Sequence, residues 1–278
     1  MNILKAILFG IIEGITEWMP ISSTAHMKIL NVFLPLDVSP EFYSVFEVVI
    51  QLGAILALVI VFFNKIWPFG QSRNPLGEGI LSYIKKDKFI LWIKIIVACI
   101  PVILFELLLD DLFTFINEKN EMTFIGFALI LVGIVFILVE MAVKGKKFTV
   151  TSTRQITYMQ ALIIGLAQLI AAIFPGVSRS GSTIIAALLL GISRPTATEF
   201  TFEVAIPVMF GASLMEVLKF SAAVSFTEIL TLIVGCVSAF AVSLFMIRFV
   251  LNYIRKNTFN IFGLYRILMG IIILIFLR

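Results

Sequence analysis

Six long apolar runs dominate this chain and restrict what it can fold into. They lie at about 42–63, 89–109, 122–143, 198–219, 227–249 and 261–277. Each has roughly the twenty residues that a helix needs to cross the hydrocarbon core of a bilayer. At 60% hydrophobic and 14% charged residues, the chain carries more apolar surface than a soluble domain of 278 residues can bury. We therefore predict an all-α polytopic membrane protein, because continuous runs argue against a β-barrel, whose strands alternate.

A polar stretch interrupts the apolar sequence near the N-terminus. Residues 10–26 read Gly-Ile-Ile-Glu-Gly-Ile-Thr-Glu-Trp-Met-Pro-Ile-Ser-Ser-Thr-Ala-His. Glu13 and Glu17 are one helical turn apart, so they share a face of a helix predicted at 3–19. Pro20 then breaks that helix, because proline lacks an N–H group and clashes with the preceding turn.

A second, shorter helix is predicted after this break, at 23–34. Ser22 or Ser23 is suited to cap its N-terminus. Because it is too short to cross a bilayer, we expect it to form a re-entrant hairpin with the helix at 3–19. Irregular backbone at membrane depth is tolerated only when it is buried in protein or lines an aqueous cavity.

A related stretch lies in the second half of the chain. Residues 165–183 read Gly-Leu-Ala-Gln-Leu-Ile-Ala-Ala-Ile-Phe-Pro-Gly-Val-Ser-Arg-Ser-Gly-Ser-Thr. The proline again follows the first glycine by ten residues, and a second broken pair is predicted at 156–174 and 181–191. In this alignment Glu13 corresponds to Gln168 and Glu17 to Ala172. The first copy therefore carries the acids and the second carries an arginine, Arg179.

The distribution of Lys and Arg among the loops tests this arrangement of helices in the membrane. Thirteen Lys or Arg fall in the loops at 64–88, 143–157, 191–198 and 248–261, and five fall on the other side, at Lys5, Lys28, Lys119, Lys219 and Arg278. The excess places the first set of loops in the cytoplasm. It also explains the net charge of +4 without a nucleic-acid partner.

The same layout predicts two repeats within a single membrane domain, residues 1–278. Repeat one covers about 1–143 and repeat two about 156–278, each with one re-entrant hairpin and three transmembrane helices. Because three is an odd number of crossings, the second repeat must be inverted relative to the first.

The acids and the single histidine are the first candidates for chemistry. A carboxylate inside a bilayer is costly and indicates a function when it faces a cavity. Glu13 and Glu17 could share a divalent cation, or one could act as a base; the alternative is that one of them is solvated at the membrane surface. For His26, the choice between proton transfer, phosphate contact and a structural role stays open.

Hydroxyl groups gather at the two predicted helix N-termini. They are Ser22, Ser23 and Thr24 at the first break and Ser178, Ser180, Ser182 and Thr183 at the second. Free N–H groups and the helix dipole favour anions at such termini, although helix capping alone could explain some of these residues. The planar guanidinium of Arg179 suits phosphate or carboxylate. Glu47, Gln51 and Gln168 are candidate supporting groups, and the role of Glu203, a polar residue in an apolar run, stays open.

Both stretches resemble the signature motifs of the undecaprenyl-diphosphate phosphatase family, also called the bacitracin-resistance family. The first matches Glu-x-x-x-Glu followed by Pro-x-Ser-Ser-Thr-x-His, and the second matches Pro-Gly-x-Ser-Arg-Ser-x-x-Thr. The resemblance covers essentially the whole chain. It implies hydrolysis of the terminal phosphate of undecaprenyl diphosphate, which recycles the carrier lipid for peptidoglycan synthesis.

The resemblance also implies how the site is organised. It implies an inverted repeat, a divalent cation such as Mg²⁺ or Ca²⁺, and a site open to the extracytoplasmic side of the bacterial plasma membrane. Carried over by motif, the catalytic candidates are Glu13, Glu17, Ser23, His26 and Arg179, and the phosphate-binding candidates are Ser178, Arg179, Ser180 and Thr183. Ser22 and Thr24, at the first helix N-terminus, are added as phosphate-binding candidates. We expect Ser23, assisted by His26, to be the nucleophile, with an activated water as the alternative.

A transporter or flippase of a phosphorylated polyprenyl lipid is the rival interpretation. Broken helices that meet inside a membrane are also used by secondary transporters. The concentration of Glu, Ser and His in one hairpin favours an enzyme, since transport does not require those groups. The expected partners are undecaprenyl diphosphate and the membrane, and a homodimer is left open.

Overall fold

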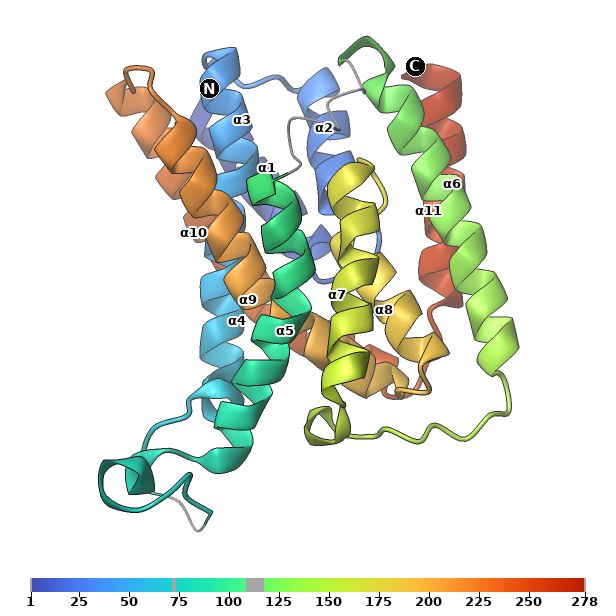
Figure 1. Cartoon of the computed structure of the whole chain (residues 1–278). Coiled ribbons are helices and arrows are strands. Elements are labelled where there is room, and N and C mark those ends of the chain that lie inside the picture. Colours follow the sequence, from blue (N-terminus) through green and yellow to red (C-terminus); the bar gives the residue numbers. More distant parts are fainter. Residues whose placement is uncertain (1, 72–73, 109–117, 278) are drawn as a thin grey trace.

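The computed structural model describes residues 2–71, 74–108 and 118–277, and this part of the chain is almost entirely helical. Its helices are α1 (Asn2–Thr16), α2 (Ser23–Phe33), α3 (Pro40–Val49), α4 (Gln51–Ile66), η1 (Gly79–Tyr83), α5 (Lys86–Leu108), α6 (Glu118–Val143), η3 (Thr153–Gln155), α7 (Tyr158–Ile173), α8 (Arg179–Leu189), α9 (Arg194–Lys219), α10 (Phe226–Ile254) and α11 (Asn260–Phe276) (Figure 1). The β contacts between described residues are isolated bridges in loops. The all-α prediction is therefore confirmed.

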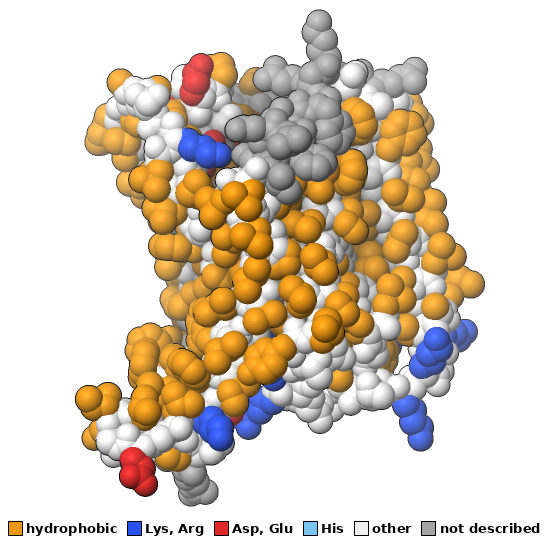
Figure 2. Space-filling view, viewed as in Figure 1, with side chains coloured by type: hydrophobic (Ala, Val, Ile, Leu, Met, Phe, Trp, Pro, Cys, Tyr) orange, Lys and Arg blue, Asp and Glu red, His pale blue; other side chains and the backbone are white. Residues whose placement is uncertain are grey.

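Five segments are long and apolar enough to cross a membrane among the residues that the structure describes. They are Pro40–Ile66, Lys86–Leu108, Asn120–Val143, Arg194–Lys219 and Phe226–Ile254. The last predicted run forms α11, which is apolar but only 17 residues long. Apolar side chains cover the middle of the visible face, and charged ones lie toward its two ends (Figure 2). The chain is therefore a multi-pass membrane protein.

Both predicted helix breaks are present. Ser22 is the N-cap of α2, and Ser178 is the N-cap of α8. Helix α1 packs against α2, and α7 packs against α8. In Figure 1 the α1–α2 pair starts from the end of the molecule where the N-terminus lies, and the α7–α8 pair starts from the opposite end. The two breaks thus approach each other in the interior.

The predicted helix bounds need two corrections. The run at 42–63 is not one regular helix, because a tight turn at Ile50 separates α3 from α4; the Gly53 N–H bonds to the Ile50 carbonyl three residues back, at 3.1 Å. The first helix ends at Thr16 rather than at residue 19, so Glu17 lies in the turn that follows α1. The loop between the predicted runs at 89–109 and 122–143 lies largely outside the described residues.

Close contacts at glycine hold the broken pairs against long helices. Helix α1 packs along α10 at Gly10, where an added Cβ would lie 2.4 Å from the Gly235 carbonyl oxygen. Helix α7 packs along α5 at Gly165, where an added Cβ would lie 2.3 Å from the Ala98 carbonyl oxygen. Small residues at membrane helix interfaces permit this approach of backbones. Each break is therefore fixed by a full-length helix from the other half of the chain.

Candidate active site

A cavity of about 310 Å³ lies between the two helix breaks. Its polar lining residues are Glu17, Ser22, Ser23, Thr24, Gln51, Ser178, Arg179 and Ser180, and its apolar wall includes Ala171, Ala172, Pro175, Val208 and Met209. Residues that lie more than 150 positions apart in the sequence therefore share one cavity. This is the convergence that the sequence predicted.

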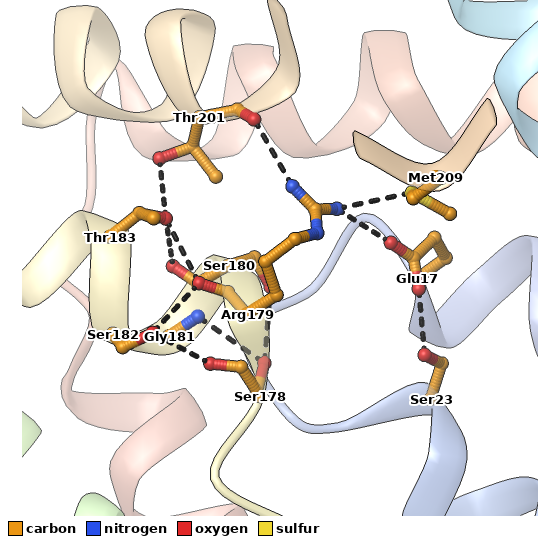
Figure 3. Close-up of polar contacts among 10 residues, drawn as sticks. All are labelled: Glu17, Ser23, Ser178, Arg179, Ser180, Gly181, Ser182, Thr183, Thr201 and Met209. Carbon is orange, nitrogen blue, oxygen red and sulfur yellow. Dashed lines mark hydrogen bonds and ion pairs between the residues drawn. The ribbon is translucent and has the colours of Figure 1, made fainter. Parts of the chain in front are cut away.

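One carboxylate connects the two breaks (Figure 3). Glu17 Oε1 accepts a hydrogen bond from Arg179 Nη2 at 2.8 Å, which is also an ion pair. Glu17 Oε2 accepts a hydrogen bond from the Ser23 hydroxyl at 2.7 Å. Glu17 and Ser23 are each 8% exposed. A base, a hydroxyl and a guanidinium thus lie within one hydrogen-bonded chain.

Helix α9 orients the Arg179 side chain from the opposite side. Arg179 Nη1 donates to the Thr201 carbonyl oxygen at 3.3 Å, and Nη2 lies 3.3 Å from Met209 Sδ. Neither of these two neighbours carries a charge, so Glu17 is the group that neutralises the guanidinium. The close-up shows the side chain extended between α9 and Glu17 (Figure 3).

The two N-capping serines adopt a strained backbone. Ser22 has a φ of 73° and Ser178 a φ of 72°, in the left-handed region that favours glycine. Each side chain accepts a hydrogen bond from the N–H group three residues on, at Ala25 and Gly181. Such a conformation costs on the order of 1 kcal/mol per residue and persists only where surrounding contacts fix it. Contacts with the rest of the fold therefore stabilise the non-helical backbone at both breaks.

The remaining hydroxyls of the second break are divided between cavity and backbone. Ser180 lines the cavity and lies 3.2 Å, oxygen to oxygen, from Ser178. Thr183 is fully buried and bonds instead to the Arg179 carbonyl oxygen and the Thr201 hydroxyl. Ser182 likewise donates to backbone carbonyls of its own helix. In this structure Ser182 and Thr183 stabilise the start of α8.

His26 is bound away from the serine that it was expected to assist. Its Nδ1 lies 2.7 Å from the Ser22 carbonyl oxygen and its Nε2 lies 2.7 Å from the Tyr265 hydroxyl. Because a carbonyl oxygen only accepts, Nδ1 carries the proton. The rings of His26 and Tyr265 are nearly parallel, at 7°. Ser23 pairs with Glu17 in place of His26.

Glu13 lies beside the cavity rather than in its lining. It is 1% exposed, and neither carboxylate oxygen has a hydrogen-bond partner among the described residues. Within the same residues there is no cluster of three His, Cys, Asp or Glu side chains that could hold a metal ion. A buried carboxylate without a partner requires a proton or a cation. Glu13 therefore fits one half of the predicted metal pair with Glu17.

The three candidate supporting residues have different surroundings in the structure. Gln51 lines the cavity. Glu47 lies 3.7 Å from Lys28, which also pairs with Glu121 at 3.0 Å. Gln168 donates to the Ala98 carbonyl oxygen at 3.1 Å and so ties α7 to α5.

Glu203 lies outside the candidate site. It lines a different cavity, together with Lys65 and Glu199. Its carboxylate therefore does not pair with Arg179.

Sequence reasoning missed Arg266. Its side chain is fully buried and donates to the carbonyl oxygens of Pro20 at 3.1 Å, Gly176 at 2.8 Å and Val177 at 3.0 Å. One guanidinium on α11 thus binds the backbone of both breaks. An arginine inside an otherwise apolar run is a signal that could have identified it.

Comparison with known proteins agrees with the motifs. Residues 6–272 match the family described as Bacitracin resistance protein BacA. An undecaprenyl-diphosphatase of Lachnoclostridium phytofermentans is 50% identical over 276 residues, which cover 98% of this chain and 96% of that protein. Undecaprenyl-diphosphatase 1 of Clostridium acetobutylicum is 49% identical over 278 residues, with 99% and 97% covered. An undecaprenyl-diphosphatase of Enterococcus faecalis is 47% identical over 275 residues, with 99% and 97% covered. The chain therefore belongs to the bacitracin resistance protein BacA family.

Proposed function

We propose that this chain hydrolyses the terminal phosphate of undecaprenyl diphosphate, giving undecaprenyl phosphate and inorganic phosphate. This is the activity for which its relatives are named. The observation that carries the proposal is the buried chain Arg179–Glu17–Ser23, which joins an anion-binding group, a base and a hydroxyl across the two breaks. The reaction recycles the lipid carrier and accounts for the link to bacitracin resistance.

Binding of the diphosphate is the first step of the proposal. Arg179 and the N–H groups at the start of α2 and α8 supply positive charge and donors at the cavity. The hydroxyls of Ser22, Thr24, Ser178 and Ser180 line the same space. Because the phosphoryl group carries its charge on peripheral oxygens, such fixed donors stabilise the transition state as well as the bound substrate.

Ser23 is the proposed nucleophile. Its oxygen attacks the terminal phosphorus, its proton passes to Glu17, and the bond to the bridging oxygen breaks so that undecaprenyl phosphate leaves. Water then releases inorganic phosphate and restores the serine. His26 would fix the Ser22 carbonyl oxygen beside this group rather than take the proton. The alternative is direct attack by a water molecule that Glu17 activates.

A divalent cation, Mg²⁺ or Ca²⁺, is proposed at Glu13 and Glu17. Support comes from the two unpartnered oxygens of Glu13. Magnesium is commonly held by one or two carboxylates together with substrate phosphate oxygens, so two acids suffice. The cation would neutralise charge on the diphosphate when bound.

An inverted repeat in the bacterial plasma membrane is proposed as the frame of the site. It is supported by the matched capping serines, Ser22 and Ser178, and by the reciprocal packing of α1 on α10 and α7 on α5. The repeats would cover about 1–143 and 156–278 of a single domain. With the basic loops in the cytoplasm, the α1–α2 hairpin would enter from the extracytoplasmic side, where the cavity would open.

Phosphate release from undecaprenyl diphosphate by the purified protein tests the proposed function. We expect one phosphate per lipid, with activity lost on addition of a chelator and restored by Mg²⁺ or Ca²⁺. Release that a chelator does not affect would remove the cation from the proposal. Movement of labelled lipid between leaflets without any phosphate release would favour the transporter over the enzyme.

A further inference from the structure

An apolar groove of about 540 Å³ lies between α6 and the end of α7. Phe127, Leu131 and Ile134 line it from α6, Ile170 lines it from α7, and Phe174 lines it from the position just after α7. None of the side chains that line the groove is polar. The site chemistry described above does not use this groove.

One stretch of chain separates the groove from the polar cavity. Within residues 170–177, Ala171, Ala172 and Gly176 line the polar cavity, whereas Ile170, Phe174 and Val177 line the groove. Pro175 lines both. The two spaces therefore border the same segment of the second helix break and share Pro175 as a wall.

The two spaces differ in the chemistry that they can accept. The polar cavity holds Arg179 and the hydroxyls of both breaks. The groove offers only hydrocarbon, and its α6 side faces the lipid: Phe127 is 60% exposed and Leu131 is 63% exposed. A molecule that fits both spaces at once has an anionic head group and an apolar chain that leaves toward the bilayer.

We propose that the groove binds the polyprenyl chain of the substrate beyond the isoprene unit that adjoins the diphosphate. This inference rests on the proposed function, because the diphosphate must occupy the polar cavity for its chain to pass Pro175. The head group is then held by Arg179 while the chain lies between α6 and α7.

A matched pair of tryptophan variants on α6 tests the groove. Leu131→Trp fills it, because Leu131 lines it. Leu138→Trp is the control: Leu138 lies seven residues on, on the same helix face, is 56% exposed and is not a groove residue. Displacing only two methylene groups from the groove corresponds to about a tenfold rise in KM. We expect that rise for undecaprenyl diphosphate with Leu131→Trp, an unchanged kcat, and parental values with Leu138→Trp.

A substrate with a single isoprene unit separates chain binding from damage to the site. The single isoprene unit of dimethylallyl diphosphate adjoins the diphosphate and ends before the groove, so we expect the same kcat/KM for it with parent and Leu131→Trp. If Leu131→Trp leaves the KM for undecaprenyl diphosphate at the parental value while the parent is active, the groove is not the chain site and the proposed function stands. A kcat/KM for dimethylallyl diphosphate that falls as much as that for the long lipid would also overturn the inference.

A binding measurement keeps the groove testable even if the parent shows no hydrolysis. A photoreactive benzophenone side chain is placed at position 131 or 138, and the protein is irradiated in vesicles with labelled undecaprenyl phosphate. We expect labelling from position 131 that excess unlabelled undecaprenyl phosphate abolishes, and weak labelling from 138 that it does not change. Labelling at 131 that competitor does not reduce would indicate bulk lipid, and a chain-to-chain cross-link would indicate a second copy; either result overturns the inference.

Discussion

Arg179 and Glu17 form an ion pair at 2.8 Å, although they are 162 positions apart in the chain. Their side chains are only 17% and 9% exposed. A lone charge at either position would be costly to bury, so each stabilises the other. The group proposed to bind phosphate is therefore already paired with the group proposed to take a proton, and an incoming phosphate must compete with Glu17 for the guanidinium.

Glu17→Gln should separate proton transfer by Glu17 from phosphate binding by Arg179. The amide keeps the size of the side chain and one accepting oxygen but cannot take a proton or neutralise Arg179. We expect turnover to fall by about a thousandfold, because a proton acceptor contributes on that scale. Measured without divalent cation, binding of undecaprenyl phosphate should stay at the parental affinity or become tighter, since Arg179 loses its competitor. Turnover at the parental rate in a folded variant would make Glu17 a purely structural residue.

Ser23→Ala distinguishes the serine nucleophile from an activated water. Loss of the hydroxyl removes the covalent route, so we expect kcat to fall by about a thousandfold or more. The parent should also form a phosphoserine on Ser23 that can be trapped by acid quenching and found by mass spectrometry. Retention of more than about a tenth of the parental kcat, with no trapped phosphoserine, would support direct attack by water.

Arg266→Met tests whether α11 holds the two breaks together. Methionine keeps an unbranched apolar side chain but has no donor, so the carbonyl oxygens of Pro20, Gly176 and Val177 would lose their partner. Each unsatisfied buried group costs about 1–3 kcal/mol, and we therefore expect a clearly lower melting temperature and a reduced kcat. Arg255→Met, at an exposed position, is the control. Equal melting temperatures for Arg266→Met and the control would contradict this role.

Local signals account for the parts of the fold that the sequence predicted. Pro20 and Pro175 end helices because they lack an N–H group, and a serine caps each helix that follows. The break at Ile50 carries no such signal. Gly53, just after it, packs against the backbone of Cys236 on α10, a contact that local propensity does not reveal.

The sequence predicted several residues that line the cavity, but not how they pair. The motifs place Glu17, Ser23 and Arg179 at two breaks, and convergence of the breaks follows from an inverted layout. The partner of His26 is Tyr265, which lies 239 positions away on α11, so no spacing rule connects them. Arg266 likewise donates to backbone carbonyl oxygens. Because every residue has such an oxygen, the sequence does not show which residues Arg266 binds.

Cysteine accessibility tests the topology on which the site depends. In a background that lacks Cys99 and Cys236, a single cysteine in place of Asn120 should react with an impermeant thiol reagent in intact cells. A single cysteine in place of Ser152, in the basic loop, should react only after lysis. Both positions are exposed in the structure. Reaction of both cysteines in intact cells would contradict the inverted repeat, and with it the proposal that the two breaks enter the membrane from opposite faces.

The rate of phosphate release by the parent protein and by Arg179→Lys is the most direct test of one phosphatase site built from both breaks. Lysine keeps the charge but cannot reproduce a planar, bidentate contact with phosphate. In purified protein with undecaprenyl diphosphate as substrate, the parent should release phosphate, and Arg179→Lys should lose most of that rate while it folds and inserts normally. Release by Arg179→Lys at the parental rate, or no release by the folded parent, would contradict the account.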